Sequence, residues 1–259
     1  MALKVDVVRA QAAAWKLYDT YGFSNPRDLP LPAVARDLGV KIRVGGLRDC
    51  EARLIRAGSK GIIRLKSLDL DSGRSRFAIS HELGHWKLHE RSQGFVCSAA
   101  QLRDYKGDPA EAEANLFAVE LLMPTHFVKA FVGARDLTLE TAVDLANECN
   151  VSLTAAAIRI AKMTTHECVL IFSSNRHVQW WVSTTDRFGI WLKSQQRLQV
   201  NSAAYHACGS DPRIVYDDVA ADVWFESFAE PERLSLSEES IFLKTTNGVL
   251  TLLVMGSVD

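Results

Sequence analysis

The chain has 259 residues and a formal net charge of −1, and 47% of its residues are hydrophobic. This length is typical of one large domain or of two to three small ones, and the apolar fraction predicts sizeable cores. A net charge so close to zero excludes a chain-wide electrostatic footprint for nucleic acid or for an anionic membrane.

The first half of the chain alternates between predicted helices and strands. Apolar residues recur at helical spacing over residues 6–22, and Gly22 ends that helix. The following segments predict, in chain order, a short helix at 34–38 and strands at 40–44, 53–55 and 61–65. Two longer helices come next, one from 74 to 88 behind a loop of capping side chains and one from 110 to 123 with Pro109 in its first turn.

The second half of the chain differs from the first in its predicted secondary structure and in its charge. Two or three short helices are predicted within 137–164, and strands at 168–172, 177–182 and 248–254. The net charge is +4 over residues 1–128, zero over 129–165 and −5 over 166–259. We therefore expect an α+β protein with three domains, 1–128, 129–165 and 166–259.

The N-terminus and the cysteines favour a cytoplasmic protein. The first residues carry charges throughout and lack the apolar segment of a signal peptide, and no apolar run is long enough to span a bilayer. Five cysteines are scattered singly: Cys50, Cys97, Cys149, Cys168 and Cys208. An odd, unpatterned set predicts reduced thiols and argues against a cysteine zinc site, so we expect no membrane contact and no disulfide framework.

Residues 81–85 read His-Glu-Leu-Gly-His within the predicted helix 74–88. His81 and His85 are one helical turn apart on one face, which lets two imidazoles bind one metal ion. Catalytic zinc usually takes three protein ligands and a water molecule. Glu82 is the predicted catalytic base, because a carboxylate beside the ion can accept a proton from the attacking water.

A third metal ligand has to come from the next long helix. We choose Glu113, whose helical face is shared by Phe117 and Glu120, and expect Glu111 to point to a different side of the helix. The alternative is that the histidines are incidental and that these glutamates are surface residues. The set of predicted metal ligands is therefore His81, His85 and Glu113.

Other polar residues near the motif leave alternatives open. His89, one turn beyond His85, is a ligand, a support for a ligand or a structural residue, and the structural role is favoured. His126 and Tyr105 are candidates for stabilising an oxyanion. The strand 61–65 is either the sheet edge that pairs with an extended substrate or an interior strand, with nothing in the sequence to decide.

Two longer stretches carry a family resemblance. Residues 74–89 read Arg-Ser-Arg-Phe-Ala-Ile-Ser-His-Glu-Leu-Gly-His-Trp-Lys-Leu-His, and residues 113–124 read Glu-Ala-Asn-Leu-Phe-Ala-Val-Glu-Leu-Leu-Met-Pro. Together they resemble the ImmA/IrrE family of zinc metallopeptidases. The resemblance implies a zincin-like, gluzincin-type domain with zinc on His81, His85 and Glu113 and with Glu82 as the catalytic glutamate. Residues 151–159 also resemble the helix-turn-helix segment of the IrrE branch, and the strands after 166 occupy the place of its GAF-like domain.

The resemblance implies an endopeptidase that cuts a helix-turn-helix repressor of the XRE type, relieving repression in a stress, DNA-damage or mobile-element response. Direct DNA binding is not expected, because residues 129–165 lack a basic face. The GAF-like part could bind a small signal molecule. Zinc is the expected metal, with manganese or iron as alternatives for a site of two histidines and one carboxylate. The competing function is a DNA-binding regulator or ligand sensor whose metal site is not catalytic.

Overall fold

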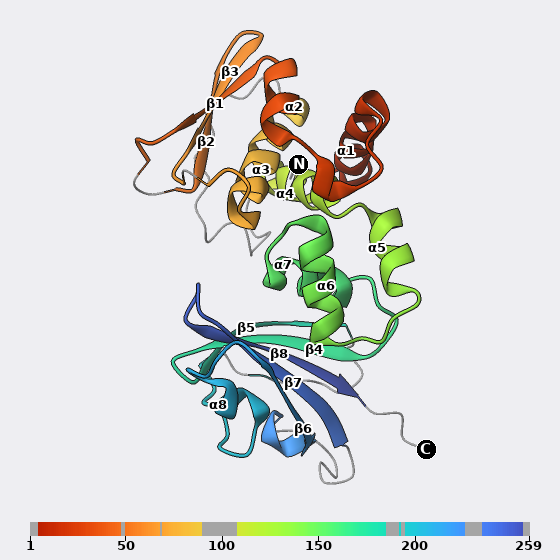
Figure 1. Ribbon diagram of the computed structural model, residues 1–259, viewed down its shortest axis with the longest axis vertical. Coiled ribbons are helices and arrows are strands. Elements are labelled where there is room, and N and C mark those ends of the chain that lie inside the picture. Colours follow the sequence, from red (N-terminus) through yellow and green to blue (C-terminus); the bar gives the residue numbers. More distant parts are fainter. Residues whose placement is uncertain are drawn as a thin grey trace. The chain divides into compact units, whose positions relative to one another are not determined.

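The computed structural model describes residues 5–47, 50–67, 69–89, 108–184, 192, 195–225 and 235–255 (Figure 1). The chain divides into two compact units, Met1–Val128 with Ala146–Ser152 and Lys129–Leu145 with Leu153–Asp259. Both helices and sheets are present, so the predicted α+β class is confirmed. Within the described ranges, no helix has the length and apolar character needed to cross a membrane. The separation of residues 129–165 from 166–259 stays a prediction.

The first unit combines helices with one small sheet. Its elements are α1 (Val7–Tyr21), η1 (Pro26–Asp28), α2 (Leu31–Asp37), β1 (Val40–Val44), β2 (Ala52–Ala57), β3 (Lys60–Leu65), α3 (Gly73–Leu88) and α4 (Pro109–Leu122). Helices α5 (Thr125–Val132) and α6 (Leu139–Cys149) each run from one unit into the other. Helix α2 begins earlier than predicted, because Pro32 has the φ angle of a first helical turn and needs no N–H partner there.

Local capping fixes where the helices of the first unit begin and end. The side chain of Asp6 accepts a hydrogen bond from the backbone N–H of Arg9 and starts α1, which ends at Gly22 with φ +67°. The Ser72 side chain caps α3, and the Asp108 side chain caps α4 in the same way. Such side chains satisfy backbone donors that a helix cannot satisfy itself.

The three-stranded sheet has the order β1-β3-β2, with β1 parallel and β2 antiparallel to β3. The strand predicted at 61–65 is therefore interior, and the alternative that it is a free edge is wrong. Side chains alternate between the two faces of the sheet, so Ile63 and its neighbour Leu54 face the core while Ile62 and Ile55 face outward. The edge strands of this sheet are β1 and β2.

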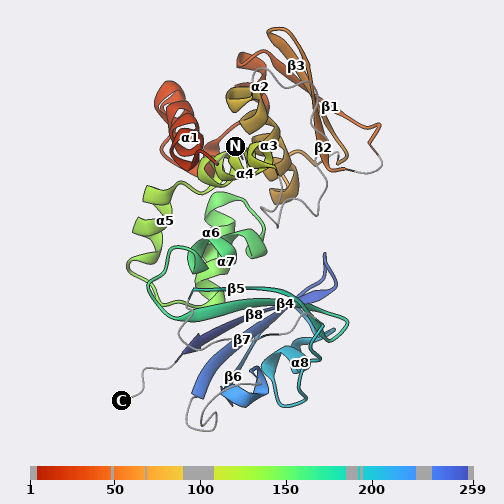
Figure 2. The ribbon, with the colours of Figure 1, turned by 180° about the vertical axis from the view of Figure 1, so that it is seen from behind.

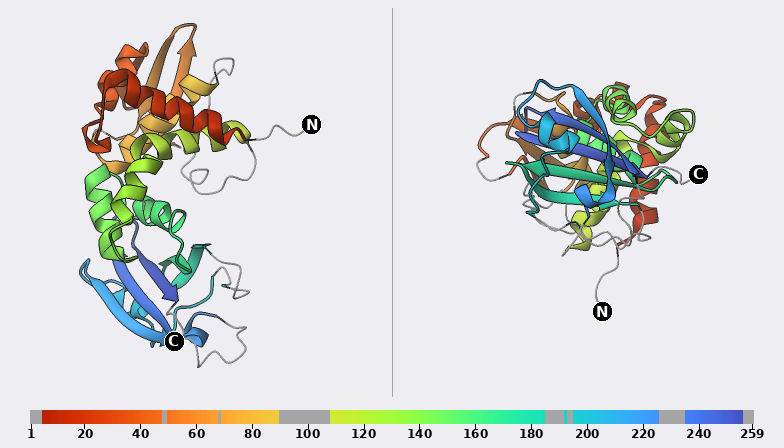
Figure 3. Two further views of the ribbon diagram at one scale, coloured as in Figure 1. Left: turned by 90° about the vertical axis from the view of Figure 1, so that its right-hand side faces the viewer. Right: turned by 90° about the horizontal axis from the view of Figure 1, so that it is seen from below.

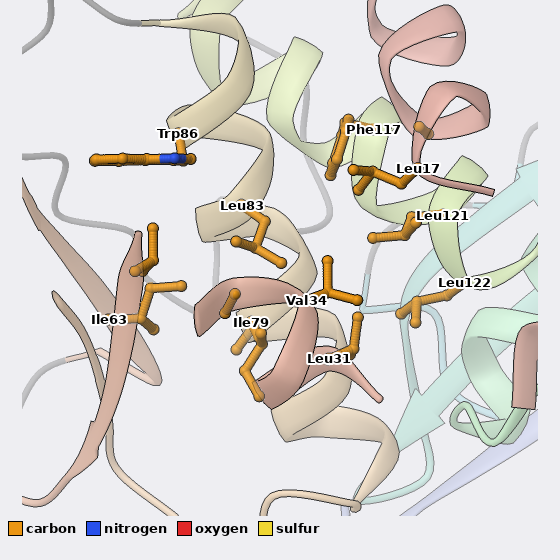
Figure 4. Close-up of a cluster of buried hydrophobic side chains, with 14 of the residues drawn as sticks. Leu17, Leu31, Val34, Ile63, Ile79, Leu83, Trp86, Phe117, Leu121 and Leu122 are labelled. Carbon is orange, nitrogen blue, oxygen red and sulfur yellow. The ribbon is translucent and has the colours of Figure 1, made fainter. Parts of the chain in front are cut away.

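The core of the first unit lies between the sheet and the helices. Figure 4 shows Ile63 of β3 facing Ile79 and Leu83 of α3, with Phe117 and Leu121 of α4 on the far side of that helix. Helix α1 runs alongside α4 (Figure 3, left), and the two helices are in contact. Helix α3 is thus enclosed by apolar neighbours on several sides, which holds its position firmly.

The second unit is built on a five-stranded antiparallel sheet with the order β5-β4-β8-β7-β6. Its elements are α7 (Leu153–Ala161), β4 (Cys168–Ser174), β5 (His177–Ser183), α8 (Ala203–Ala207), β6 (Ile214–Ala220), η2 (Ala221–Val223), β7 (Ser235–Leu243) and β8 (Gly248–Met255). Helix α8 lies against β6 and β7 (Figure 2). The expected GAF-like and helix-turn-helix assignments stay predictions.

Candidate metal centre

Helices α3 and α4 pack against each other (Figure 1). Gly84 of α3 has no side chain, and a Cβ atom built on it would lie 3.0 Å from Cα of Ala114 on α4. The contact brings the polar residues of the first turns of α4 next to His81 and His85. Both histidines are buried, with 2% and 0% of their surface exposed.

Glu111 meets both histidines. His81 Nε2 and His85 Nε2 are 3.0 Å apart. Glu111 Oε2 lies 3.3 Å from His81 Nε2, and its Oε1 lies 3.3 Å from His85 Nε2. Two imidazole nitrogens and one carboxylate therefore converge on a single point between α3 and α4.

The spacing of these atoms suits one metal ion. Tetrahedral ligands placed 2.0–2.1 Å from zinc are separated from each other by about 3.3 Å. The nitrogen–nitrogen and nitrogen–oxygen distances of 3.0 to 3.3 Å agree with that separation. Among the residues of the described ranges, His81, His85 and Glu111 form the only cluster of His, Cys, Asp or Glu with metal-ligand spacing. The predicted metal-binding character of the motif thus has a matching geometry.

Glu111 and Glu113 lie on different sides of α4, and the side that faces His81 and His85 carries Glu111. Glu113, the predicted third ligand, faces His89 instead. Glu113 Oε2 is 3.1 Å from His89 Nε2, and its Oε1 accepts the backbone N–H of Asp6 at 2.9 Å. Residues two apart on a helix project about 200° apart, so one helix cannot direct both carboxylates to one point. The geometry therefore favours Glu111 over Glu113 as the third ligand.

The Nδ1 atoms of His81 and His85 make hydrogen bonds on the side of each ring that faces away from Glu111. These bonds leave the Nε2 atoms, which face Glu111, as acceptors. His81 Nδ1 is 2.8 Å from Asn115 Oδ1, which can only accept, so Nδ1 carries the proton and Nε2 keeps its lone pair. Asn115 is one turn from Glu111 on the same face of α4. Asn115 was not among the site residues predicted from the sequence, although its spacing of four residues from Glu111 is a readable signal.

His85 is held in the same tautomer by a longer chain of groups. Its Nδ1 is 3.1 Å from Nδ1 of His89, whose Nε2 faces the Glu113 carboxylate. Because the carboxylate accepts from Nε2–H, a neutral His89 has an accepting Nδ1, and His85 donates to it. The Nε2 lone pair of His85 is then directed at the convergence point.

The protonation states of His85 and Glu111 also suit the binding of a cation. Burial lowers the pKa of His85 to about 4, although the neighbouring Glu111 opposes the shift. Burial alone would raise the pKa of Glu111, but the neighbouring His81 and His85 outweigh it and hold that pKa below its ordinary value. At neutral pH, His85 is thus neutral and Glu111 ionised, the forms in which these groups bind metals.

Glu82 occupies the position next to His81 on α3 and is fully buried. The two predicted oxyanion-stabilising candidates, His126 and Tyr105, do not belong to this helix. His126 is exposed in the first turn of α5, and Tyr105 lies outside the described residues. Among the predicted residues, His81, His85 and Glu82 are therefore the ones that the fold gathers on one buried helix.

The fold and this cluster define an α+β protein with a two-histidine, one-glutamate centre between two packed helices. Residues 35–161 match the family model of the IrrE N-terminal-like domain, peptidase family M78. The predicted resemblance to the ImmA/IrrE family is confirmed over this part of the chain.

One curated protein and one solved structure are similar to this chain. The "uncharacterized immunity region protein 2" of Bacillus phage phi105 is 29% identical over 121 residues, which are 47% of this chain and 72% of the phage protein. A Mycobacterium tuberculosis transcriptional regulator of known structure matches with a TM-score of 0.60 over 95% of this chain and 76% of its own. Because the identity to that regulator is 16%, the similarity concerns the fold alone.

Proposed function

We propose that this chain is a zinc-dependent endopeptidase that cuts a helix-turn-helix repressor of the XRE type at a specific site. The observation that carries the proposal is the convergence of His81, His85 and Glu111 on one point, with Glu82 adjacent on the same buried helix. A site that only stabilised the fold would need no buried carboxylate base beside the ligands. The match of residues 35–161 to a peptidase family supports the same reaction.

His81, His85 and Glu111 would hold the ion. When bound, zinc supplies Lewis-acid polarisation of a peptide carbonyl and makes nearby water more acidic. Glu82 takes a proton from the water that attacks the carbonyl carbon, and it returns that proton to the leaving amine nitrogen. Asn115 and His89 keep the two imidazoles in the tautomers that present Nε2.

A repressor is the proposed substrate because of the family resemblance. One relative is titled an immunity region protein of a phage, which agrees with a regulatory role in a mobile element. Residues 129–165 as a helix-turn-helix-like module, and residues 166–259 as a GAF-like domain that binds a small signal molecule, are parts of the same proposal. The neutral charge of residues 129–165 supports contact with protein over DNA.

Co-incubation with the XRE-type repressor encoded nearest to the gene tests the function. We expect mass spectrometry to find one or few cleavage products with zinc present and none after chelation. A Glu82→Gln variant run in parallel excludes a contaminating protease. An intact repressor under all conditions, together with unchanged regulation in cells that carry Glu82→Gln, would refute the peptidase and favour the regulator or ligand-sensor alternative.

A further inference from the structure

Glu113 and His89 lie behind His85 as two successive hydrogen-bonding partners. The backbone N–H of Asp6 donates to Glu113 Oε1 at 2.9 Å, and Glu113 Oε2 lies 3.1 Å from His89 Nε2. His89 Nδ1 in turn lies 3.1 Å from His85 Nδ1. These contacts join the start of α1, the second turn of α4 and the end of α3.

We propose that Glu113 and His89 are positioning residues that fix the tautomer and ring orientation of the metal ligand His85. The inference rests on the metal site of the proposed function. Each hydrogen bond in this series fixes which atom donates and which accepts in the next one. Asp6 N–H occupies one carboxylate oxygen, the other oxygen accepts His89 Nε2–H, and the remaining nitrogen of His89 accepts His85 Nδ1–H.

A glutamine at position 113 would disturb this series of hydrogen bonds. Glutamine has a single oxygen, whereas both Asp6 N–H and His89 Nε2–H require an acceptor. If its NH₂ group faces His89, the proton of His89 moves to Nδ1 and that of His85 moves to Nε2. The proton would then sit on the atom that should bind the metal.

The test compares zinc affinity and the His85 tautomer in the full chain. For Glu113→Gln and His89→Ala, we expect zinc to bind 10- to 100-fold more weakly by chelator competition. Imidazole ¹⁵N shifts of the metal-free protein should show the His85 proton redistributed from Nδ1 to Nε2. His89→Asn offers a carbonyl acceptor near the position of Nδ1 and should recover affinity relative to His89→Ala.

Glu111→Gln is the comparison variant, since it removes a proposed ligand and should lose far more affinity than Glu113→Gln. Equal losses would identify Glu113 as a ligand and overturn the proposal. Wild-type affinity and an unchanged tautomer in Glu113→Gln would overturn it as well. A wild-type protein that binds zinc but cleaves no repressor would refute the proposed function and leave the positioning role standing.

The outward face of the three-stranded sheet carries a row of three arginines. Arg43, Arg64 and Arg53 are direct neighbours across β1, β3 and β2. Like charges placed opposite each other on adjacent strands are destabilising. No carboxylate of the described residues forms an ion pair with any of the three, and the buried Nε of Arg53 has no hydrogen-bond partner among them.

The same face has an apolar row beside the arginines. Ile55 and Ile62 are paired across β2 and β3 and remain 43% and 38% exposed, and Lys41 pairs with Ile62 from the other side. No acidic residue occurs in β1, β2 or β3. A partner that complements this face needs negative charge next to apolar side chains.

We infer that this face docks an acidic, partly apolar segment of the protein substrate, remote from the scissile bond. Charge complementarity requires the acidic groups, because the arginine row repels itself until it is neutralised. The exposed isoleucines favour a polypeptide over a phosphate backbone, which offers them no apolar contact. The identity of the partner as the substrate rests on the proposed function.

Kinetics of the Arg43→Gln/Arg64→Gln variant tests this surface. We expect KM for the repressor to rise about tenfold and kcat to stay unchanged, because a docking contact contributes equally to ground and transition states. The variant Lys162→Gln/Arg213→Gln has the same change in charge at exposed positions of the second unit and should keep the wild-type KM.

An unchanged KM in Arg43→Gln/Arg64→Gln would overturn the docking surface. Inhibition of repressor cleavage by a 20-base-pair DNA duplex would also overturn the docking surface if the double variant were no longer inhibited. The face would then bind nucleic acid. If the wild type cleaves no repressor, the proposed function fails. Binding of a fluorescent Glu/Val-rich peptide then tests the face directly, and equal affinity for the wild type and the variant would refute it.

Discussion

Gly84 on α3 and Ala114 on α4 are in close contact, and a methyl group at position 84 would need its neighbours to shift by a few tenths of an ångström. A Cβ there would lie 3.0 Å from Ala114 Cα, 3.1 Å from its carbonyl oxygen and 3.1 Å from Cδ1 of Phe117. This contact lies between the two helices that carry the proposed ligands.

The first prediction concerns Gly84→Ala. Alanine gains about 1 kcal/mol of helix propensity, but its methyl group needs Ala114 and Phe117 to shift, and these residues share α4 with Glu111. We expect weaker zinc binding and a lower unfolding midpoint despite the gain in propensity, measured by chelator competition and urea denaturation. A variant with wild-type affinity would show that the helix contact does not set the ligand geometry.

Metal binding should stabilise the folded chain by linkage. An ion that binds only the folded state adds about 2.7 kcal/mol at a free concentration of one hundred times Kd. We expect the thermal midpoint to rise with free zinc and to fall on chelation, and the Glu111→Gln variant to lose the response. An identical zinc response in Glu111→Gln would place the ion elsewhere.

The metal-free protein should lose stability in mild acid. The pKa of His85 is lowered by burial from 6.5 to about 4, so the unfolded chain binds a proton that the folded chain excludes between these values. The stabilisation is fully present above pH 6.5 and is lost as the pH falls through 4, and it amounts to about 3 kcal/mol.

Urea denaturation in chelator between pH 7.5 and 4.5 measures this loss. His85→Asn should make the dependence of unfolding free energy on pH shallower, whereas His166→Gln, at an exposed position, should leave it unchanged. Parallel slopes for wild type and His85→Asn would contradict the assignment.

Gly61 of β3 packs against the ring of Trp86 on α3, the helix that carries the histidine motif. A Cβ at Gly61 would lie 2.9 Å from Cζ3 of Trp86, whose ring also carries the Arg56 guanidinium 3.7 Å from its centroid. Gly61→Ala should displace this ring and lower the free energy of unfolding by about 1–3 kcal/mol, the usual cost of overpacking. Unchanged denaturation by urea would mean that Trp86 moves without cost.

Much of the first unit could be predicted because its signals are local. Helical periodicity and capping side chains indicated α1, α3 and α4, and the spacing of His81 and His85 placed both rings on one face. Glu111, the proposed third ligand, was not predicted because α4 is buried on most of its surface. A helix enclosed on all sides shows no apolar stripe, so periodicity could not reveal which side of α4 meets α3.

The second unit contains elements whose causes are not local. Strand β7 carries Glu238 and Glu239, which are unusual in a buried strand and gave no signal for one. Glu238 accepts hydrogen bonds from Ala204 N–H and from Trp224 Nε1–H, and Glu239 accepts from Leu139 N–H. Only the tertiary structure supplies these donors, so residue pattern alone could not predict β7.

The proposed reaction requires that Glu82 transfers protons and does not hold the metal. The most direct measurement is the zinc content and the repressor cleavage of the Glu82→Gln variant, compared with the wild type in the same preparation. We expect one zinc per chain in both proteins and cleavage by the wild type alone. Cleavage by Glu82→Gln at the wild-type rate would contradict the proposed role of Glu82.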